Sequence, residues 1–317
     1  MELSTLTLEE QKQAILVNNG LNFSIEKLPM FAERSKIITT LSNEGNVIET
    51  AIKESIPSEY YGLLNTKSGN IINTVKAGYT VTQNDEIIET VLRGMKGFGE
   101  LSVQKAGSIN DGRKVFIQLA IEGMSKVGND SIKRYVTILD SNDGTSGLCI
   151  GIGDLTMSCQ NQFFKFYKRG EAKFRHTATI ADKVKTIPSL IQLALSESMQ
   201  LIQLYNKFQS TPVSRELANK LVNEIFGFDR TSSVKELSEI STKSTNAMES
   251  LYRNIEDQTN DKNWNLWGLH SGVTRWTTFD KSAPQRENGR LESIMTGTNY
   301  NTNQKSFEFC IKQLELV

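Results

Sequence analysis

The chain has 317 residues, of which 38% are hydrophobic and 23% are charged, a composition typical of a soluble globular protein with one large core or two domains. Its 36 basic residues balance 36 acidic residues, so no global electrostatic field attracts DNA or an anionic membrane. Any nucleic-acid site must therefore be a local patch.

The N-terminus and the cysteines indicate a compartment. The first residues, MELSTLTLEEQKQAILV, are acidic where a secretory signal peptide is basic, and their apolar run is too short to cross a bilayer. The three cysteines, Cys149, Cys159 and Cys310, have no CxxC spacing, which fits a reducing environment better than a disulfide scaffold. We therefore expect a cytoplasmic protein without a membrane segment.

The first third of the chain mixes helical and strand patterns. Apolar residues at helical spacing with early glutamates predict a short helix over Thr7 to Val17. The stretch from Met30 to Glu54 indicates short strands around the turn Asn43-Glu44-Gly45-Asn46. A second helix is predicted from Asp85 to Met95, with Gly94 near its end.

The centre of the chain has the pattern of a strand meander. Alternating runs flank Asn110-Asp111-Gly112, the strongest short-range hairpin signal in the sequence, and flank Asn142-Asp143-Gly144 in the same way. A third strand pair is predicted around Arg169-Gly170. Together these runs predict a central antiparallel sheet from about Tyr60 to Ile180.

After Asp182 the pattern becomes helical. Apolar residues near a 3.6-residue period predict a helix long enough to cross a sheet face, and further helices follow at Ser214 to Phe226, Ser233 to Glu256 and Trp264 to Phe279. The predicted fold class is α+β, with a central antiparallel meander backed by long helices. We expect an N-terminal extension over residues 1–58, a central α+β domain over 59–210 and a helical C-terminal portion over 211–317, packed on the core.

Ordered blocks along the chain carry a family resemblance. They read YYGLLN, GYTVTQNDEI, KAGSINDGRKVFIQLAI, TILDSNDGTSG, MSCQNQF, FRHT, NLWGLHSGVTRWTT and RENGRLESIMTG. From about Tyr60 to Phe309 the chain resembles the phage/plasmid-like family catalogued as domain of unknown function 932. The resemblance implies a protein carried by phages, prophages and plasmids, often beside DNA-repair and anti-restriction genes, and hence the host cytoplasm for a phage-encoded copy. Family members usually have a histidine where this chain has Asn142, which argues against a histidine-dependent activity at that turn.

Residues Ser158 to Thr177, SCQNQFFKFYKRGEAKFRHT, combine aromatic rings with a local excess of cations. Because alternate residues of a strand share a face, Phe164 and Phe166 project to one side while Lys165 and Tyr167 project to the other. Two interpretations are open. The stretch is either a solvated strand, since lysines commonly protect sheet edges, or a surface on which Tyr167 stacks with a base and cations hold phosphates.

The second interpretation defines the predicted nucleic-acid site. Its residues are Lys165, Tyr167, Lys168, Arg169, Lys173 and Arg175, with Arg113 and Lys114 on a second basic hairpin. If the hairpins are neighbours, their cations merge into one stripe across a sheet that a long helix backs on its other face. This outline is similar, at the level of fold alone, to single-strand annealing proteins, which bind single-stranded DNA in a basic groove on oligomeric rings.

Catalytic and metal sites have weaker support in the sequence. Cys159 and His176 share a predicted hairpin, but they are explained equally well by a buried cysteine and a half-buried histidine. Asp140, Asp143 and Asp154 lie near predicted turns, where aspartate is favoured by turn geometry alone. There is no HExxH, no zinc-finger spacing, and no glycine pattern that continues as a phosphate-binding loop.

We therefore expect a phage or mobile-element DNA-metabolism protein that binds single-stranded DNA without catalysis and without a cofactor, and leave open whether it is a homo-oligomer with annealing activity. The alternative is a protein-interaction or anti-defence factor that binds a host or phage protein through the Trp-rich helix or the polar loop from Ser282 to Arg290. A metal-dependent nuclease using the three aspartates is the third hypothesis. In the Trp-rich segment, core packing of Trp264, Trp267 and His270 is the competing interpretation.

Overall fold

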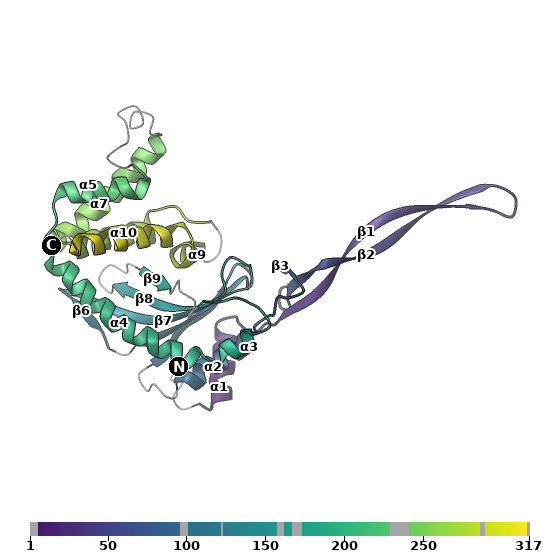
Figure 1. Cartoon of the computed structure of the whole chain (residues 1–317), viewed down its shortest axis with the longest axis horizontal. Helices are drawn as coiled ribbons and strands as arrows, with labels where there is room; N and C mark the ends of the chain where they lie inside the picture. Colours follow the sequence, from purple (N-terminus) through teal and green to yellow (C-terminus); the bar gives the residue numbers. More distant parts are fainter. Residues whose placement is uncertain are drawn as a thin grey trace.

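Two antiparallel sheets and two groups of helices make up the chain (Figure 1). The computed structural model describes residues 6–95, 101–121, 123–156, 162–166, 173–228, 241–285 and 289–315. The fold class is α+β, as the sequence predicts.

The N-terminal helix α1, Leu8–Asn18, begins at a capping box. The Thr7 hydroxyl accepts a hydrogen bond from the Glu10 backbone N–H at 3.3 Å, and the Glu10 carboxylate accepts one from the Thr7 N–H at 2.8 Å. The helix packs against α2, Asn84–Met95, so both helices predicted in this region are confirmed.

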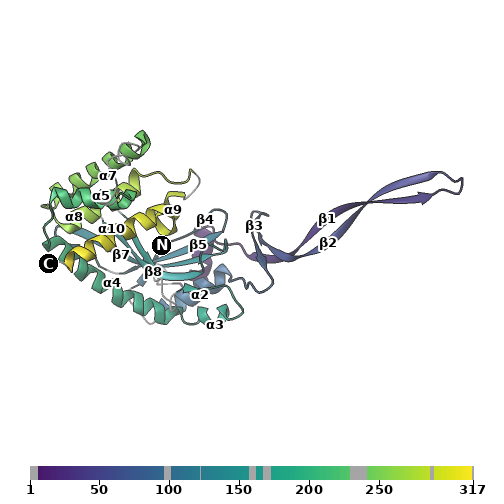
Figure 2. The same ribbon diagram turned by 45° about the horizontal axis from the view of Figure 1, so that its top comes forward.

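A long two-stranded arm projects from the body of the molecule (Figures 1 and 2). It is formed by β1, Ile25–Leu41, and β2, Val47–Asn65, paired antiparallel over almost their whole lengths. The predicted turn at residues 43–46 is confirmed, but the prediction of short strands is wrong, because the strands have 17 and 19 residues. We call residues 28–60 the arm; below it, β3, Ile71–Lys76, pairs with the base of β2.

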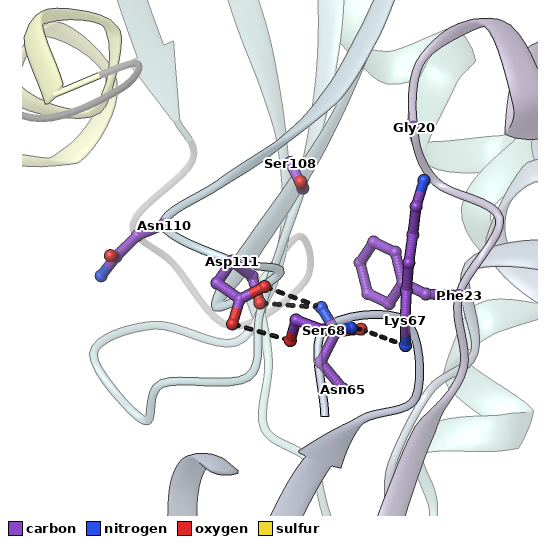
Figure 3. Close-up of a pocket in the computed structure, with 8 residues that line it drawn as sticks. All are labelled: Gly20, Phe23, Asn65, Lys67, Ser68, Ser108, Asn110 and Asp111. Atoms are coloured by element: carbon purple, nitrogen blue, oxygen red, sulfur yellow. Dashed lines mark hydrogen bonds between the residues drawn. The ribbon is translucent and has the colours of Figure 1, made fainter. Parts of the chain in front are cut away.

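The base of the arm is fixed to the body by the turn between β4 and β5. The Asp111 carboxylate accepts hydrogen bonds at 2.9 Å from the Ser68 hydroxyl and from the Asn70 amide, while the Asn65 amide donates to the Asp111 carbonyl oxygen at 3.0 Å. Beside this network lies a cleft of about 420 Å³, lined on its other side by Phe23 (Figure 3). The polar side chains around Asp111 bond to one another, so they anchor the arm.

The larger sheet has seven strands and forms the centre of the body. Along the sheet the order is β10-β8-β7-β5-β4, while β6 pairs with β7 and β9 with β8. The strands are β4 Leu101–Ile109, β5 Lys114–Ile121, β6 Ser125–Val127, β7 Asp130–Ser141, β8 Leu148–Thr156, β9 Gln162–Phe166 and β10 Lys173–Phe174. The hairpins predicted at residues 110–112 and 142–144 are confirmed as β4–β5 and β7–β8, and positive φ angles at Asn110, Asp111 and Gly112 fit the first turn.

The third predicted strand pair has a different arrangement. Strand β9 pairs with residues 151–155 of β8, and β10 pairs with residues 148–149 of the same strand. Within the described residues β9 and β10 are therefore successive partners of β8 and do not pair with each other. The expected turn at Arg169-Gly170 lies outside the described residues.

Helices cover the two faces of the large sheet unequally. One face contributes Val115, Ile117, Ile138 and Ile150 to a core with α1, α2, α3, Ile180–Val184, and α4, Ile187–Ser210. This α4 is the long sheet-crossing helix that the sequence predicts; it runs below the sheet in Figure 1, with α9 and α10 above. Its C-terminal half also packs against α10, where Tyr205 and Phe208 contact Phe307.

On the second face, the last two helices, α9 (Gly289–Thr296) and α10 (Thr298–Leu314), cover one part of the sheet. Phe116 and Leu139 contact Ile294 and Met295 there. Farther from the β4–β5 turn, the described strand residues on this face are mostly polar or small, and Gln118, Ala120 and Thr137 are buried there without belonging to these apolar clusters. That polar part of the face matters for the site described below.

The remaining helices are α5 (Arg215–Phe226), α7 (Thr242–Asp261) and α8 (Leu266–Phe279). Helix α8 is central: Trp267 and Trp276 are each 4% exposed, and the Trp267 indole donates to Asp130 at 2.7 Å. Core packing of Trp267 and His270 is thus confirmed, and the alternative that places the Trp-rich helix at an interaction surface is wrong. Trp264 precedes the helix and is half-buried. Among the described helices, none combines the length and the apolar character needed to span a bilayer.

Candidate nucleic-acid interface

The predicted basic stretch lies at the β8 edge of the large sheet. Lys165 belongs to β9 and Lys173 to β10, and both strands pair with β8. Tyr167, Lys168 and Arg169 lie outside the described residues. Backbone pairing therefore places the start of the predicted site at the β8 edge of the sheet.

The other predicted cations differ in accessibility. Arg175, after β10, and Arg113, in the β4–β5 turn, are exposed. Lys114 is 5% exposed, and its Nζ lies 3.0 Å from a Glu292 carboxylate oxygen and 3.5 Å from one of Asp143. Contrary to its expected place on an exposed basic surface, Lys114 faces α9 because it is the first residue of β5 and projects to the helix-covered side.

The polar loop of the alternative hypothesis is only partly a loop. Ser282 and Gln285 are exposed, and residues 286–288 lie outside the described part of the chain. Arg290 belongs to α9, and its guanidinium donates to the carbonyl oxygens of Lys281 at 2.9 Å and Thr278 at 3.2 Å. These hydrogen bonds hold the start of α9 against the end of α8, so the expectation that Arg290 lies in an exposed loop is wrong.

A polar cleft lies over the polar part of the second sheet face. It has a volume of about 280 Å³; strands β4, β5, β7, β8 and β9 all contribute to its lining, and so does Leu291 of α9. Lys105 pairs with Gln118 and Tyr135 pairs with Gly153, and paired residues of antiparallel strands project to the same face. Because Gly153 has no side chain, it leaves room beside the Tyr135 ring.

Two cations flank this cleft. Lys105 is exposed, and its Nζ lies 5.9 Å from the centroid of the Phe116 ring. Lys133 lies two residues before Tyr135 on β7 and on the same face; its Nζ is 5.7 Å from the centroid of the Tyr135 ring and donates to the Gln104 amide oxygen at 2.9 Å. Neither lysine forms an ion pair with a carboxylate in the described part of the chain. Burial raises the pKa of Tyr135, so its phenol is neutral.

The cleft and the predicted basic stretch are adjacent. Gln162 is the first residue of β9 and lines the cleft, and the sequence from Lys165 to Arg175 follows it directly. The structure thus brings Lys105, Lys133 and Tyr135 next to the strand that opens the basic stretch. The sequence pattern does not predict Tyr135 as part of this site, because only the strand register shows that it shares a face with the two lysines.

A second polar cluster lies in the interior, at the β7–β8 end of the sheet. His176 Nε2 lies 2.9 Å from Asp140 Oδ1, and the Thr82 hydroxyl donates to Asp140 Oδ2 at 2.6 Å. The Tyr79 ring stacks on the His176 ring with centroids 4.8 Å apart, and His176 Nδ1 lies 3.2 Å from the Thr80 carbonyl oxygen. Both side chains of the ion pair are 2% exposed.

The electrostatics of this cluster favour a charged histidine. Burial by itself lowers the pKa of His176, but the Asp140 carboxylate and the Thr80 carbonyl outweigh it, so the pKa is raised above 6.5. A pair so deeply enclosed holds segments together and does not reach a dissolved substrate. His176 is therefore a structural residue in this state of the molecule, while Cys159, its proposed catalytic partner, lies outside the described residues.

The three aspartates of the nuclease hypothesis have separate partners. Asp140 contacts His176, Asp143 accepts hydrogen bonds from Ser141 and Thr145, and Asp154 accepts one from the Tyr205 hydroxyl at 2.9 Å. In the described part of the chain, no group of three or more potential ligands is placed to hold a metal ion.

The interior cluster also gathers blocks of the sequence resemblance. Thr82 comes from GYTVTQNDEI, Asp140 from TILDSNDGTSG and His176 from FRHT, three segments far apart in the chain. The fold and this cluster define an α+β protein in which a buried histidine–aspartate pair joins the segment after β10 to strand β7. The chain belongs to the family described as "Domain of unknown function (DUF932)", which matches residues 71–299. Neither curated proteins nor solved structures give a match to the chain. The family match begins at β3, so the arm precedes it.

Proposed function

We propose that this protein binds single-stranded DNA without catalysis, as a DNA-metabolism protein of a phage or mobile element. The observation that carries the proposal is the cleft beside which Lys105 and Lys133 flank Tyr135 on one sheet face. Cations that neutralise phosphates and an aromatic ring that stacks with a base are the combination that binds single strands without reading their sequence. Annealing of complementary strands is a further activity that this mode of binding permits.

The chemistry of the cleft fits a flexible anionic strand better than a compact ligand. Its amides, from Gln104, Gln118 and Gln162, are neutral donors and acceptors. Lys105 lines the cleft and Lys133 lies beside it, while the carboxyl group of the lining residue Asp154 is buried and accepts a hydrogen bond from Tyr205. Because the chain has no net charge, the attraction to DNA comes from this local patch and from the basic stretch beside it.

The test is fluorescence anisotropy of a labelled single strand of about 30 nucleotides, titrated with protein between about 50 and 200 mM salt. The Lys105→Ala/Lys133→Ala variant is expected to bind more weakly, with a salt slope smaller by about 0.7 for each cation removed. A Lys165→Ala/Lys168→Ala/Arg169→Ala variant tests the basic stretch in the same way.

The matched control removes two exposed lysines from the helical layer, Lys220→Ala/Lys243→Ala, and is expected to leave affinity and salt slope unchanged. Binding that is absent at low salt would overturn the proposal. Binding that is equal in the wild type and in both cleft and stretch variants would place the DNA elsewhere on the molecule.

A further inference from the structure

The arm exposes apolar side chains on both faces. Phe31 is 55% exposed, Ile37 64%, Leu41 73%, Val47 64% and Ile48 48%. A two-stranded hairpin by itself is marginally stable in water, and it gains independent stability from further strands or from packing against another surface. Nothing in the described part of the same chain packs on the arm beyond its base, so its apolar surface requires a partner molecule.

The charge of the arm indicates what kind of partner it fits. Residues 28–60 contain three basic and five acidic residues, a net charge of −2. Within the hairpin, Arg34 pairs with Glu54 at 2.6 Å and Lys53 with Glu33 at 2.9 Å. This composition does not attract the phosphates of nucleic acid or of an anionic membrane, so the partner is a protein surface.

One edge of the arm is open for strand pairing. On one side β2 pairs with β1, and on the other side β3 pairs with β2 only over Tyr60 to Leu64. Among the described residues, no strand pairs with this second edge of β2 from Val47 to Glu59, and a free strand edge is the feature by which sheets recruit further strands.

The charges along this edge are self-complementary. If two copies of β2 pair antiparallel about a two-fold axis at Ala51, Glu49 lies opposite Lys53 of the partner subunit, and the symmetry repeats the contact. We propose that the arm joins two copies of this chain through this pairing, forming the four-stranded sheet β1-β2-β2-β1.

Other registers of the same strand are less favourable. Centring the axis on Glu49 or on Lys53 places that residue opposite its own copy, with like charges in contact. Pairing through β1 about Ser35 places Arg34 opposite Lys36 of the partner subunit. The register at Ala51 makes two opposite-charge contacts and no like-charge contact between the residues it aligns.

The same register brings the apolar residues of the two arms together. Ala51 lies opposite Ile37 and Val47 opposite Leu41 within one arm, so these four side chains share a face. The two-fold axis through Ala51 makes this face continuous with the equivalent face of the second arm. The proposal is independent of DNA binding, because the arm and the cleft share no residue.

The first experiment measures molar mass by size-exclusion chromatography with light scattering, over a range of concentrations of the full chain. The wild type is expected to be a dimer. Glu49→Lys is expected to raise the dimer dissociation constant roughly tenfold or more, because each contact becomes lysine against lysine. The double variant Glu49→Lys/Lys53→Glu is expected to restore the dimer, since the charges are exchanged.

The control for added charge is Glu44→Lys in the arm turn, which is expected to leave the dimer unchanged. A wild type that stays monomeric at all concentrations would overturn the proposal and indicate a different protein partner. A dimer that is insensitive to Glu49→Lys would also overturn it.

The second experiment tests the register with engineered cysteines. Directly opposed residues have Cα atoms about 4.5–5.5 Å apart, which is within disulfide range. Ala51→Cys is therefore expected to form an inter-subunit disulfide under mild oxidation. Ser55→Cys is not, since the two copies of residue 55 would be about 27 Å apart along the strands. Cross-linking of both variants to the same extent would contradict the register.

Discussion

His176 and Asp140 form a buried pair, with Nε2 of the imidazole 2.9 Å from Oδ1 of the carboxylate. The second ring nitrogen, Nδ1, lies 3.2 Å from the carbonyl oxygen of Thr80, which only accepts hydrogen bonds. A doubly protonated ring satisfies both contacts at once. The pair therefore joins the segment after β10 to strand β7 by a charge interaction, and the contact with Thr80 adds the connection before α2.

This pair predicts a specific pH dependence of stability. Because the folded pKa of His176 lies above its unfolded value of 6.5, the contribution of the charged ring is fully present below about pH 6.5 and is lost as the pH rises through the folded pKa. Urea unfolding of His176→Gln and wild type is expected to show a stability difference that is largest near pH 6 and shrinks by pH 8.5. A difference that does not change with pH would contradict a charged His176.

Asp154 predicts a dependence in a different pH window. Burial raises its pKa to about 7, against the opposing effects of the Tyr205 hydroxyl and Arg134. Between pH 3.8 and about 7 the folded protein keeps a proton that the unfolded chain releases, so this group destabilises the fold by about 1.4 kcal/mol per pH unit as the pH rises. The Asp154→Asn side chain cannot ionise. In urea unfolding at pH 5, 6 and 7, the free energy of unfolding of this variant relative to the wild type is therefore expected to rise by that amount for each pH unit.

The comparison must be made between variant and wild type at each pH. Burial lowers the pKa of His270 to about 3, so the unfolded chain binds a proton below pH 6.5 that the folded protein does not. His270 therefore lowers the free energy of unfolding as the pH falls, which offsets the opposite effect of Asp154 in the wild type. The difference between the two proteins removes this background. A constant difference from pH 5 to pH 7 would show that the Asp154 carboxyl titrates in its ordinary range.

The elements that the sequence predicted well are those with local signals. The hairpin at Asn110-Asp111-Gly112 follows from three residues that accept positive φ, and the helix α4 follows from a long apolar period. Helix α1 follows from its cap, Thr7, and from Glu10 three residues later. In each case the deciding interactions lie within a few residues of one another.

The features that the sequence did not predict depend on distant partners. The length of the arm was missed because its strands have no core face to impose a clean alternation of apolar and polar residues. The pairing of β10 with β8, and the contact of His176 with Asp140, join residues that no local pattern connects. The face on which Tyr135 lies is fixed by register, which a single sequence does not supply.

Lys114 shows how a basic residue misleads when its face is unknown. Its ammonium lies between Asp143 and Glu292, whose side chains are each 12% exposed, so removal of the charge leaves two largely enclosed carboxylates without this cation. Lys114→Met is expected to lower the free energy of unfolding by about 3–5 kcal/mol in a urea titration. Arg113→Met, one residue earlier and exposed, is the matched control and is expected to change it by less than about 0.5 kcal/mol. Equal effects would contradict the buried role of Lys114.

Gly112 tests the docking of the arm base on the body. Its φ is +81°, and an added Cβ would lie 2.7 Å from the Phe23 ring. Gly112→Ala is expected to cost about 1–2 kcal/mol for the backbone conformation and about 1–3 kcal/mol more for the contact. Gly45→Ala, with φ of +82° and nothing within 4 Å of the Cβ, carries the first cost alone. Thermal melting should therefore rank Gly112→Ala well below Gly45→Ala, and the reverse order would contradict the packing of Phe23.

Tyr135 separates stacking from charge attraction in the proposed DNA site. Replacement of a stacking ring costs about 1–3 kcal/mol of binding, so Tyr135→Ala is expected to weaken single-strand binding about 5- to 150-fold, whereas Tyr135→Phe keeps the ring and the affinity. Since neither change removes a cation, the salt slope of binding is expected to stay at the wild-type value in both variants. Anisotropy titrations at two salt concentrations measure both quantities, and thermal melting of each variant confirms that it folds. A Tyr135→Ala protein that melts like the wild type and binds DNA with wild-type affinity would remove the ring from the site and leave the lysines as a purely electrostatic track.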